Sequence, residues 1–85
     1  MSQAYEYQVC NVQYGRVTFV NGAWNGSVPM SGDTSQSLES CPNVWDYLRD
    51  AGREGWELVS VVTHPQEVKE AALDVLYLKR AASSW

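Results

Sequence analysis

The sequence contains few of the residues from which metal sites and disulfide scaffolds are built. It has two cysteines, Cys10 and Cys41, and one histidine, His64, in 85 residues. No C-x-x-C or Cys/His spacing is present, so the sequence offers no zinc motif. In a reducing compartment the simplest prediction is two free thiols, although the sequence does not show whether the fold brings them within disulfide distance. We therefore expect no metal and no cofactor.

Basic residues and long apolar runs are also scarce. Six Lys and Arg stand against ten Asp and Glu, which gives a net charge of −4. A nucleic-acid-binding protein normally gathers Lys and Arg on one face. No run approaches the roughly 20 apolar residues of a membrane span, and the first residues lack the basic and apolar regions of a signal peptide. We therefore expect a cytoplasmic protein that binds neither nucleic acid nor membrane.

The length of the chain predicts one small domain that covers residues 1–85. A chain of this length buries only about 60–65% of the surface that its unfolded form exposes. Its hydrophobic fraction of 45% and charged fraction of 19% are ordinary for a soluble globular domain. These values exclude a multidomain enzyme, a disordered tail and a coiled-coil or collagen-like rod.

Alternation and turn residues predict the strands. The expected strands are residues 5–12, 16–20, a third strand through Trp24, 56–63 and 75–80. Asn21-Gly22 is the strongest short signal for a hairpin, because a type I′ turn needs positive φ at both central positions. Residues 56–63 carry apolar side chains on both faces, which predicts a strand that is either central or covered on each side.

One amphipathic helix is expected after a polar loop over residues 29–39. Ser40 is the predicted N-cap, with Pro42 in the first turn. The apolar stripe consists of Val44, Trp45, Leu48 and Ala51, and the solvated face carries the ion pairs Asp46–Arg49 and Asp50–Arg53. A polar connection with a turn of helix over residues 67–71 precedes the last strand.

These elements predict an α+β fold. We expect a small, mostly antiparallel sheet of four to five strands with one helix packed on one face, in the chain order β-β-β-α-β-β. The last strand is expected between the first strand and the 56–63 strand, and the hairpin beside the first strand. Leu48, Leu58, Trp45 and Trp56 are expected in the core between helix and sheet.

Three segments carry a resemblance to a known family. They are Tyr5-Glu-Tyr-Gln-Val, Gly55-Trp-Glu-Leu-Val-Ser-Val-Val and Tyr77-Leu-Lys-Arg. Their order resembles the small bacterial proteins grouped as domain of unknown function 4177. The resemblance covers residues 5–10 and about 44–80, and an insertion-like hairpin and polar loop at about 13–43 departs from it. Because the activity of that family is unknown, the resemblance implies a fold and no chemistry.

Aromatic residues are abundant for so small a domain. Four Trp and five Tyr exceed what one small core can bury, and both residue types are enriched at interfaces. Trp24, Tyr14 and Trp85 are left over after the core is assigned. We therefore predict a homo-oligomer that also binds protein partners, with residues 16–28 and Trp24 in the contact surface.

Two other functions remain open at this stage. One is a module that binds a small anionic metabolite through Arg16, Arg49 or Arg53 beside the aromatic residues. The other is a small enzyme whose site lies between subunits. Because no pair of nucleophile and base stands out in the sequence, the enzyme is the weakest of the three hypotheses, and we name no catalytic residue.

Overall fold

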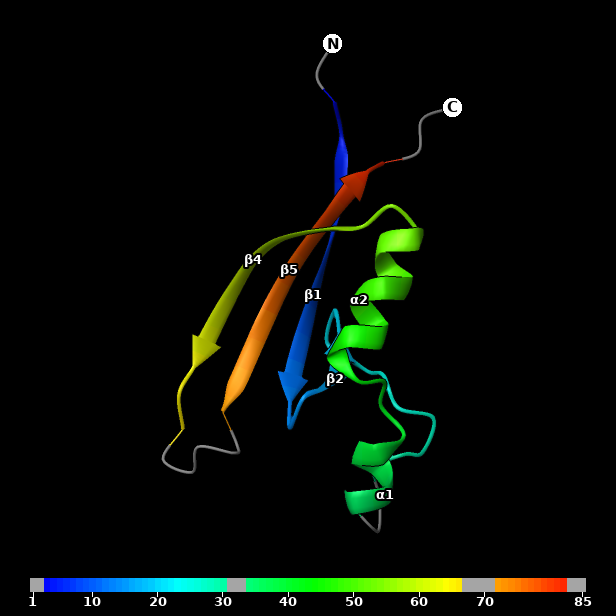
Figure 1. Cartoon of the computed structure of the whole chain (residues 1–85), viewed down its shortest axis with the longest axis vertical. Coiled ribbons are helices and arrows are strands. Elements are labelled where there is room, and N and C mark those ends of the chain that lie inside the picture. The colour runs from blue at the N-terminus through cyan, green and yellow to red at the C-terminus, as the bar shows by residue number, and fades with distance from the viewer. Residues whose placement is uncertain (1–2, 31–33, 67–71, 83–85) are drawn as a thin grey trace.

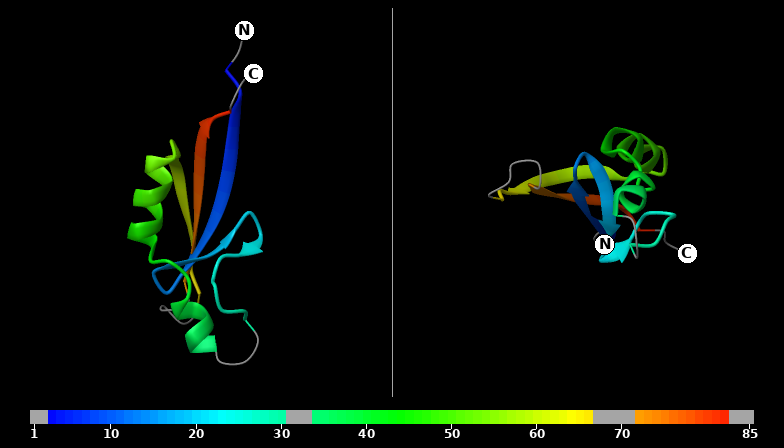
Figure 2. Two further views of the ribbon diagram at one scale, coloured as in Figure 1. Left: turned by 90° about the vertical axis from the view of Figure 1, so that its right-hand side faces the viewer. Right: turned by 90° about the horizontal axis from the view of Figure 1, so that it is seen from below.

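The computed structural model describes residues 3–30, 34–66 and 72–82, and these residues form one five-stranded antiparallel sheet and two helices. The elements are β1 (Tyr5–Gln13), β2 (Arg16–Val20), β3 (Ala23–Trp24), α1 (Thr34–Glu39), α2 (Val44–Arg53), β4 (Glu57–His64) and β5 (Leu73–Ala81). The strand order is β3-β2-β1-β5-β4, and α2 lies along one side of the sheet (Figures 1 and 2). The predicted α+β class is confirmed, including the place of β5 between β1 and β4.

The predicted hairpin at Asn21-Gly22 is present. Asn21 has φ 51° and Gly22 has φ 81°, as a turn with positive φ at both central positions requires. The Asn21 side chain also fastens the turn to β1, because its Oδ1 accepts a hydrogen bond of 2.8 Å from the backbone N–H of Val9. The strand that follows is short and sets Trp24 opposite Phe19.

The core lies between α2 and the neighbouring strands. Its buried residues are Cys10, Val12, Val17, Ala51, Leu76 and Leu78, with Val20, Val44, Tyr47, Leu48 and Trp56 packed against them. On α2 these residues recur at three- and four-residue spacing, which puts them on one stripe. Leu48 and Trp56 are therefore placed as predicted. Trp45 is not, because it lies about 100° round the helix from Val44 and is 71% exposed.

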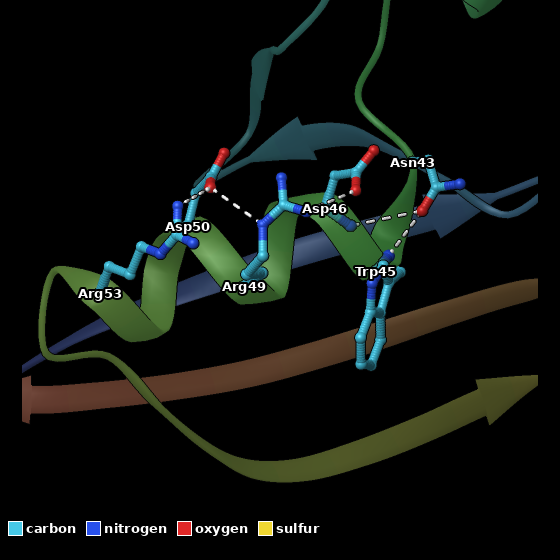
Figure 3. Close-up of polar contacts among 6 residues, drawn as sticks. All are labelled: Asn43, Trp45, Asp46, Arg49, Asp50 and Arg53. Atoms are coloured by element: carbon cyan, nitrogen blue, oxygen red, sulfur yellow. Dashed lines mark hydrogen bonds and ion pairs between the residues drawn. The ribbon is translucent and has the colours of Figure 1, made fainter.

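The segment before α2 differs from the prediction in two ways. Asn43 caps the helix instead of Ser40, since its Oδ1 accepts hydrogen bonds from the backbone N–H groups of Trp45 (2.8 Å) and Asp46 (3.4 Å), as Figure 3 shows. The Ser40 hydroxyl is engaged elsewhere, because it donates to the Ser37 carbonyl and accepts from the N–H of Val28.

The loop predicted for residues 29–39 contains the short helix α1. The Ser37 hydroxyl holds this helix against the preceding segment by donating to the carbonyl of Pro29 at 2.5 Å. Residues 31–33, and the helical turn predicted over residues 67–71, lie outside the described residues.

The prediction that residues 56–63 form a strand that is central or covered on each side is wrong, because β4 is an edge strand with both faces exposed. β5 occupies the position between β1 and β4, so β4 pairs with β5 alone among the described strands. In Figure 1, α2 lies toward β1 and leaves β4 uncovered at the far edge of the sheet. All eight residues of β4 are exposed. Leu58, which was expected in the core, is 42% exposed.

Gly26 lies where a side chain has no room. A Cβ at this position would be 2.9 Å from the Trp24 ring and closer still to the Ser40 hydroxyl. Gly26→Ala is therefore expected to lower the free energy of unfolding by about 1–3 kcal/mol, because packed groups must move. Urea unfolding measures the change.

The matched control is Gly52→Ala in α2. An added Cβ there meets nothing within 4 Å, and alanine favours the helical backbone over glycine by roughly 0.5–1 kcal/mol. This variant should therefore be more stable than the wild type. Equal effects of the two substitutions would contradict the close packing at Gly26.

Candidate interaction surface

Four exposed apolar side chains follow one another closely along β4. They are Leu58 (42% exposed), Val59 (52%), Val61 (50%) and Val62 (41%), and we refer to them as the β4 surface. A single exposed apolar residue is ordinary on a soluble protein. A contiguous group of them marks a site of interaction.

A β-bulge distributes the β4 surface over both faces of the sheet. Leu58 is paired with Leu78, and Val61 with Leu76. Because Leu76 and Leu78 belong to the core under α2 and paired residues share a face, Leu58 and Val61 point to the helix side. The register shifts between Leu58 and Ser60. The extra residue, Val59, and Val62 therefore point to the side away from the helix.

The outer edge of β4 carries free backbone groups. No described strand pairs with this edge, and an unpaired edge is a template for a strand from another chain. Natural proteins often protect such edges with charged residues or proline. In β4 the titratable side chains, Glu57 and His64, stand at the two ends of the strand. The middle of the edge is therefore unprotected by charge.

Trp45 adds to the exposed apolar area on the helix side. Its indole leaves the first turn of α2 toward β5 and β4, as Figure 3 shows, and the residue is 71% exposed. It therefore lies on the same side of the sheet as Leu58 and Val61. The sequence pattern missed this role because it assigned Trp45 to the core.

The other face of the sheet carries three exposed tyrosines. Tyr5 is 45%, Tyr7 63% and Tyr77 38% exposed. Tyr77 is paired with Ser60 of β4, and the Lys79 ammonium lies 4.7 Å from the centre of the Tyr5 ring. Apolar and aromatic area therefore continues from β4 across β5 to β1 on the face away from α2.

Two of the predicted site residues, Tyr14 and Trp24, line one cavity of about 420 Å³. Its apolar walls are completed by Phe19, Met30 and Leu38. Trp24 is partly buried in its own chain: its ring meets Phe19 edge-on at a centroid distance of 5.4 Å. Its indole N–H donates to the carbonyl of Val28 at 2.9 Å. Trp85 lies outside the described residues.

Arg16 joins β2 to the segment that leads into α2. Its Nη1 donates to the carbonyl oxygens of Glu39 (3.2 Å) and Cys41 (2.7 Å). The backbone repeats this connection, since the N–H of Val17 donates to the carbonyl of Pro42 at 2.9 Å. Arg16 therefore has a structural role in positioning α2.

Arg49 and Arg53 lie on the solvated face of α2, as predicted. Arg49 is 3.4 Å from Asp46 and 3.5 Å from Asp50, and Arg53 is 3.7 Å from Asp50 (Figure 3). Such exposed pairs contribute only a few tenths of a kcal/mol each. Neither arginine lines the cavity of Tyr14 and Trp24, and neither does Arg16.

A polar cluster lies beneath α2, beside a second cavity of about 280 Å³. The Tyr47 hydroxyl donates to Oε1 of the buried Gln8, and the Cys10 thiol donates to the same oxygen at 3.2 Å. Burial raises the pKa values of Cys10 and Cys41 above the ordinary value of a thiol. Both cysteines are buried free thiols, and their raised pKa values make them poor nucleophiles.

The phenol of Tyr47 gives the fold a dependence on alkaline pH. Burial, and then the neighbouring Cys10, raise its pKa above the ordinary value of 10.0. The folded state therefore holds this proton more tightly than the unfolded chain does, so the contribution of Tyr47 to stability is complete below about pH 10 and decreases as the pH rises further. The urea midpoint should be lower at pH 11 than at pH 8.

Two variants check the source of this pH dependence. Tyr47→Phe should reduce the loss between pH 8 and pH 11, because the titrating hydroxyl is gone. Tyr7→Phe, at a tyrosine that is 63% exposed, should keep the loss seen in the wild type. If both variants behave alike, Tyr47 is not the group responsible.

Comparison with other proteins gives no relatives, since no family model, curated protein or solved structure matches the chain. The resemblance to domain of unknown function 4177 therefore stays a prediction. No group of three or more His, Cys, Asp or Glu among the described residues could hold a metal ion. In the same part of the chain, every helix is too short or too polar to cross a membrane.

Proposed function

We propose that the protein is an assembly or adaptor module that works by self-association and by binding protein partners. The β4 surface carries this proposal. Apolar residues on both faces are typical of a strand that is covered on both sides, yet both faces of β4 are exposed in the single chain. A second chain is the natural source of the missing cover.

The dimensions of the chain support the same proposal. The whole chain, termini included, exposes 6052 Å², whereas a 9.5 kDa monomer is expected to expose about 5,000 Å². Its radius of gyration is 14.3 Å, against about 12 Å for a compact domain of this length.

Size-exclusion chromatography with light scattering tests self-association. At tens of micromolar the expected mass is a multiple of the 9.5 kDa of one chain. The mass should decrease on dilution as the assembly dissociates. A mass of one chain at every concentration would overturn the proposed self-association.

Binding of a small molecule is the second candidate function, and the cavity of Tyr14 and Trp24 favours it. A volume of about 420 Å³ falls within the range of about 300–1,000 Å³ that is usual for ligand sites. Because its walls include Phe19, Met30 and Leu38, the expected ligand is an apolar or aromatic molecule. The anionic metabolite considered from the sequence has no arginine to bind it there.

Thermal unfolding in the presence of a panel of aromatic compounds tests this candidate. A ligand at 100 times its dissociation constant adds about 2.7 kcal/mol to the free energy of unfolding. A shift that is lost in a variant with a filled cavity, such as Leu38→Trp, would support the site. If no compound of the panel shifts the unfolding temperature, binding of a small molecule at this cavity is rejected.

A further inference from the structure

We propose that two copies of this chain pair antiparallel along the outer edges of their β4 strands, with Val61 at the two-fold axis. The two five-stranded sheets then form one continuous sheet. The inference rests on the proposed self-association and adds to it the edge, the direction and the register of pairing.

The faces of the residues restrict the register, and the extent of the strand then favours Val61 as its centre. In an antiparallel pair, opposite residues point to the same face. Thr63 is paired with Asp74, on the helix side with Leu58, whereas Glu57 and His64 belong to the other face. Because the bulge lets Val59 and Ser60 share one position, Val61 is the middle of the strand.

When Val61 lies at the two-fold axis, the two residues of every opposite pair point to the same face of the sheet. Leu58 of one copy lies opposite Thr63 of the other, and Val62 lies opposite the bulge. Val61 lies opposite itself on the helix side. A shift of the two strands by one position would set residues of different faces against each other, which an antiparallel ladder does not permit. A shift by two positions keeps the faces matched but leaves residues at the ends of β4 without a partner strand, so the register centred on Val61 pairs the most residues.

The charges of β4 select the same arrangement. Its titratable side chains are Glu57 at one end and His64 at the other. The register centred on Val61 sets the carboxylate of Glu57 opposite the imidazole of His64 at each end of the interface. A parallel pairing would instead set each Glu57 beside its own copy, and like charges directly opposite each other are destabilising.

The pairing also accounts for the exposed apolar residues on both faces. A two-fold axis perpendicular to the sheet puts both α2 helices on the same side. Leu58 and Val61 of both copies then lie between the two helices, with Trp45 directed from each helix toward this space (Figure 3). On the other face Val59 and Val62 of the two copies become neighbours. Closed two-fold assembly of this kind is the commonest symmetry of homo-oligomers.

Disulfide cross-linking tests the register. Val61→Cys places a thiol opposite its own copy, with Cα atoms about 4.5–5.5 Å apart, a distance that suits a disulfide. Under mild oxidation with oxidised glutathione most of the chain should become a covalent dimer. The wild type gives the background, since Cys10 and Cys41 are buried.

His64→Cys is the matched control on the same exposed strand. In the proposed pairing this residue is about 20 Å from its own copy, six positions of about 3.4 Å each, so the variant alone should not cross-link. A mixture of Glu57→Cys and His64→Cys chains, carrying tags of different mass, should give the mixed dimer in preference to either dimer of one kind.

The outcomes separate this inference from the proposed function. A wild type that is monomeric overturns both. A wild type that is dimeric, together with a dimeric Val61→Cys variant that does not cross-link, overturns the β4 pairing and leaves self-association standing. Cross-linking of His64→Cys alone, as efficient as that of Val61→Cys, overturns the register.

Discussion

Leu78→Ala is expected to lower the free energy of unfolding by about 2–5 kcal/mol. Leu78 is 1% exposed and belongs to the core between β5 and α2, so truncation leaves a cavity among packed side chains. A domain of this size has about 5–10 kcal/mol of stability. The variant should therefore lose a large share of its stability and unfold at a clearly lower urea concentration than the wild type. Urea unfolding followed by tryptophan fluorescence measures the change.

Leu58→Ala provides the comparison, because Leu58 is the cross-strand partner of Leu78. It is 42% exposed, so its truncation creates no closed cavity and should cost less than about 1 kcal/mol. Both variants are measured over a series of protein concentrations, and their losses are compared where the midpoint no longer depends on concentration. Equal losses would show that β4 is covered within the single chain, and the proposed interface would then lie elsewhere.

The sequence predicts the sheet well where the signals are local. Asn21-Gly22 specifies its hairpin through backbone conformation, and alternation locates β1 and β5 to within a few residues. The apolar stripe of α2 is predicted correctly except at one position. Tyr47 lies three residues after Val44 and packs against the core, whereas the predicted stripe contains Trp45 in its place. The hydroxyl of Tyr47, bonded to Gln8, lets this residue be buried.

The helix α1 could not be found from periodicity. Thr34–Glu39 has a single large apolar residue, Leu38, and no amphipathic stripe. Contacts with distant parts of the chain hold it, including the bond from Ser37 to Pro29 and the donation by Arg16 to the carbonyl of Glu39. Such contacts depend on the tertiary fold and leave no local pattern.

The candidate surface was missed for a different reason. The sequence around β4 shows that both faces of the strand are apolar, and this observation is correct. It does not show which chain supplies the cover, because the pattern is the same for a strand buried in its own domain and for one buried against a second copy. The number of aromatic residues instead favoured Trp24 as the contact residue, and the structure packs its ring against Phe19.

Val61→Lys is expected to raise the dissociation constant of the homodimer by a factor of about 100 or more. Two copies of Val61 meet at the proposed axis, so the substitution removes two buried valines, worth roughly 1.5 kcal/mol each. The sum of about 3 kcal/mol corresponds to a factor of about 100. Opposed ammonium groups at the axis add repulsion. Sedimentation equilibrium over a range of concentrations measures the constant.

Met30→Lys is the matched control for this substitution. Met30 is 51% exposed, about as much as Val61, but it lines the cavity beside β2 and β3 at the opposite edge of the sheet. Met30→Lys therefore introduces the same charge without touching the proposed interface. The dissociation constant of its homodimer should stay near that of the wild type. Circular dichroism should show folded chains for both variants, because both positions are exposed. If Met30→Lys dissociates the dimer and Val61→Lys does not, the interface lies at the β3 edge, where the sequence placed it.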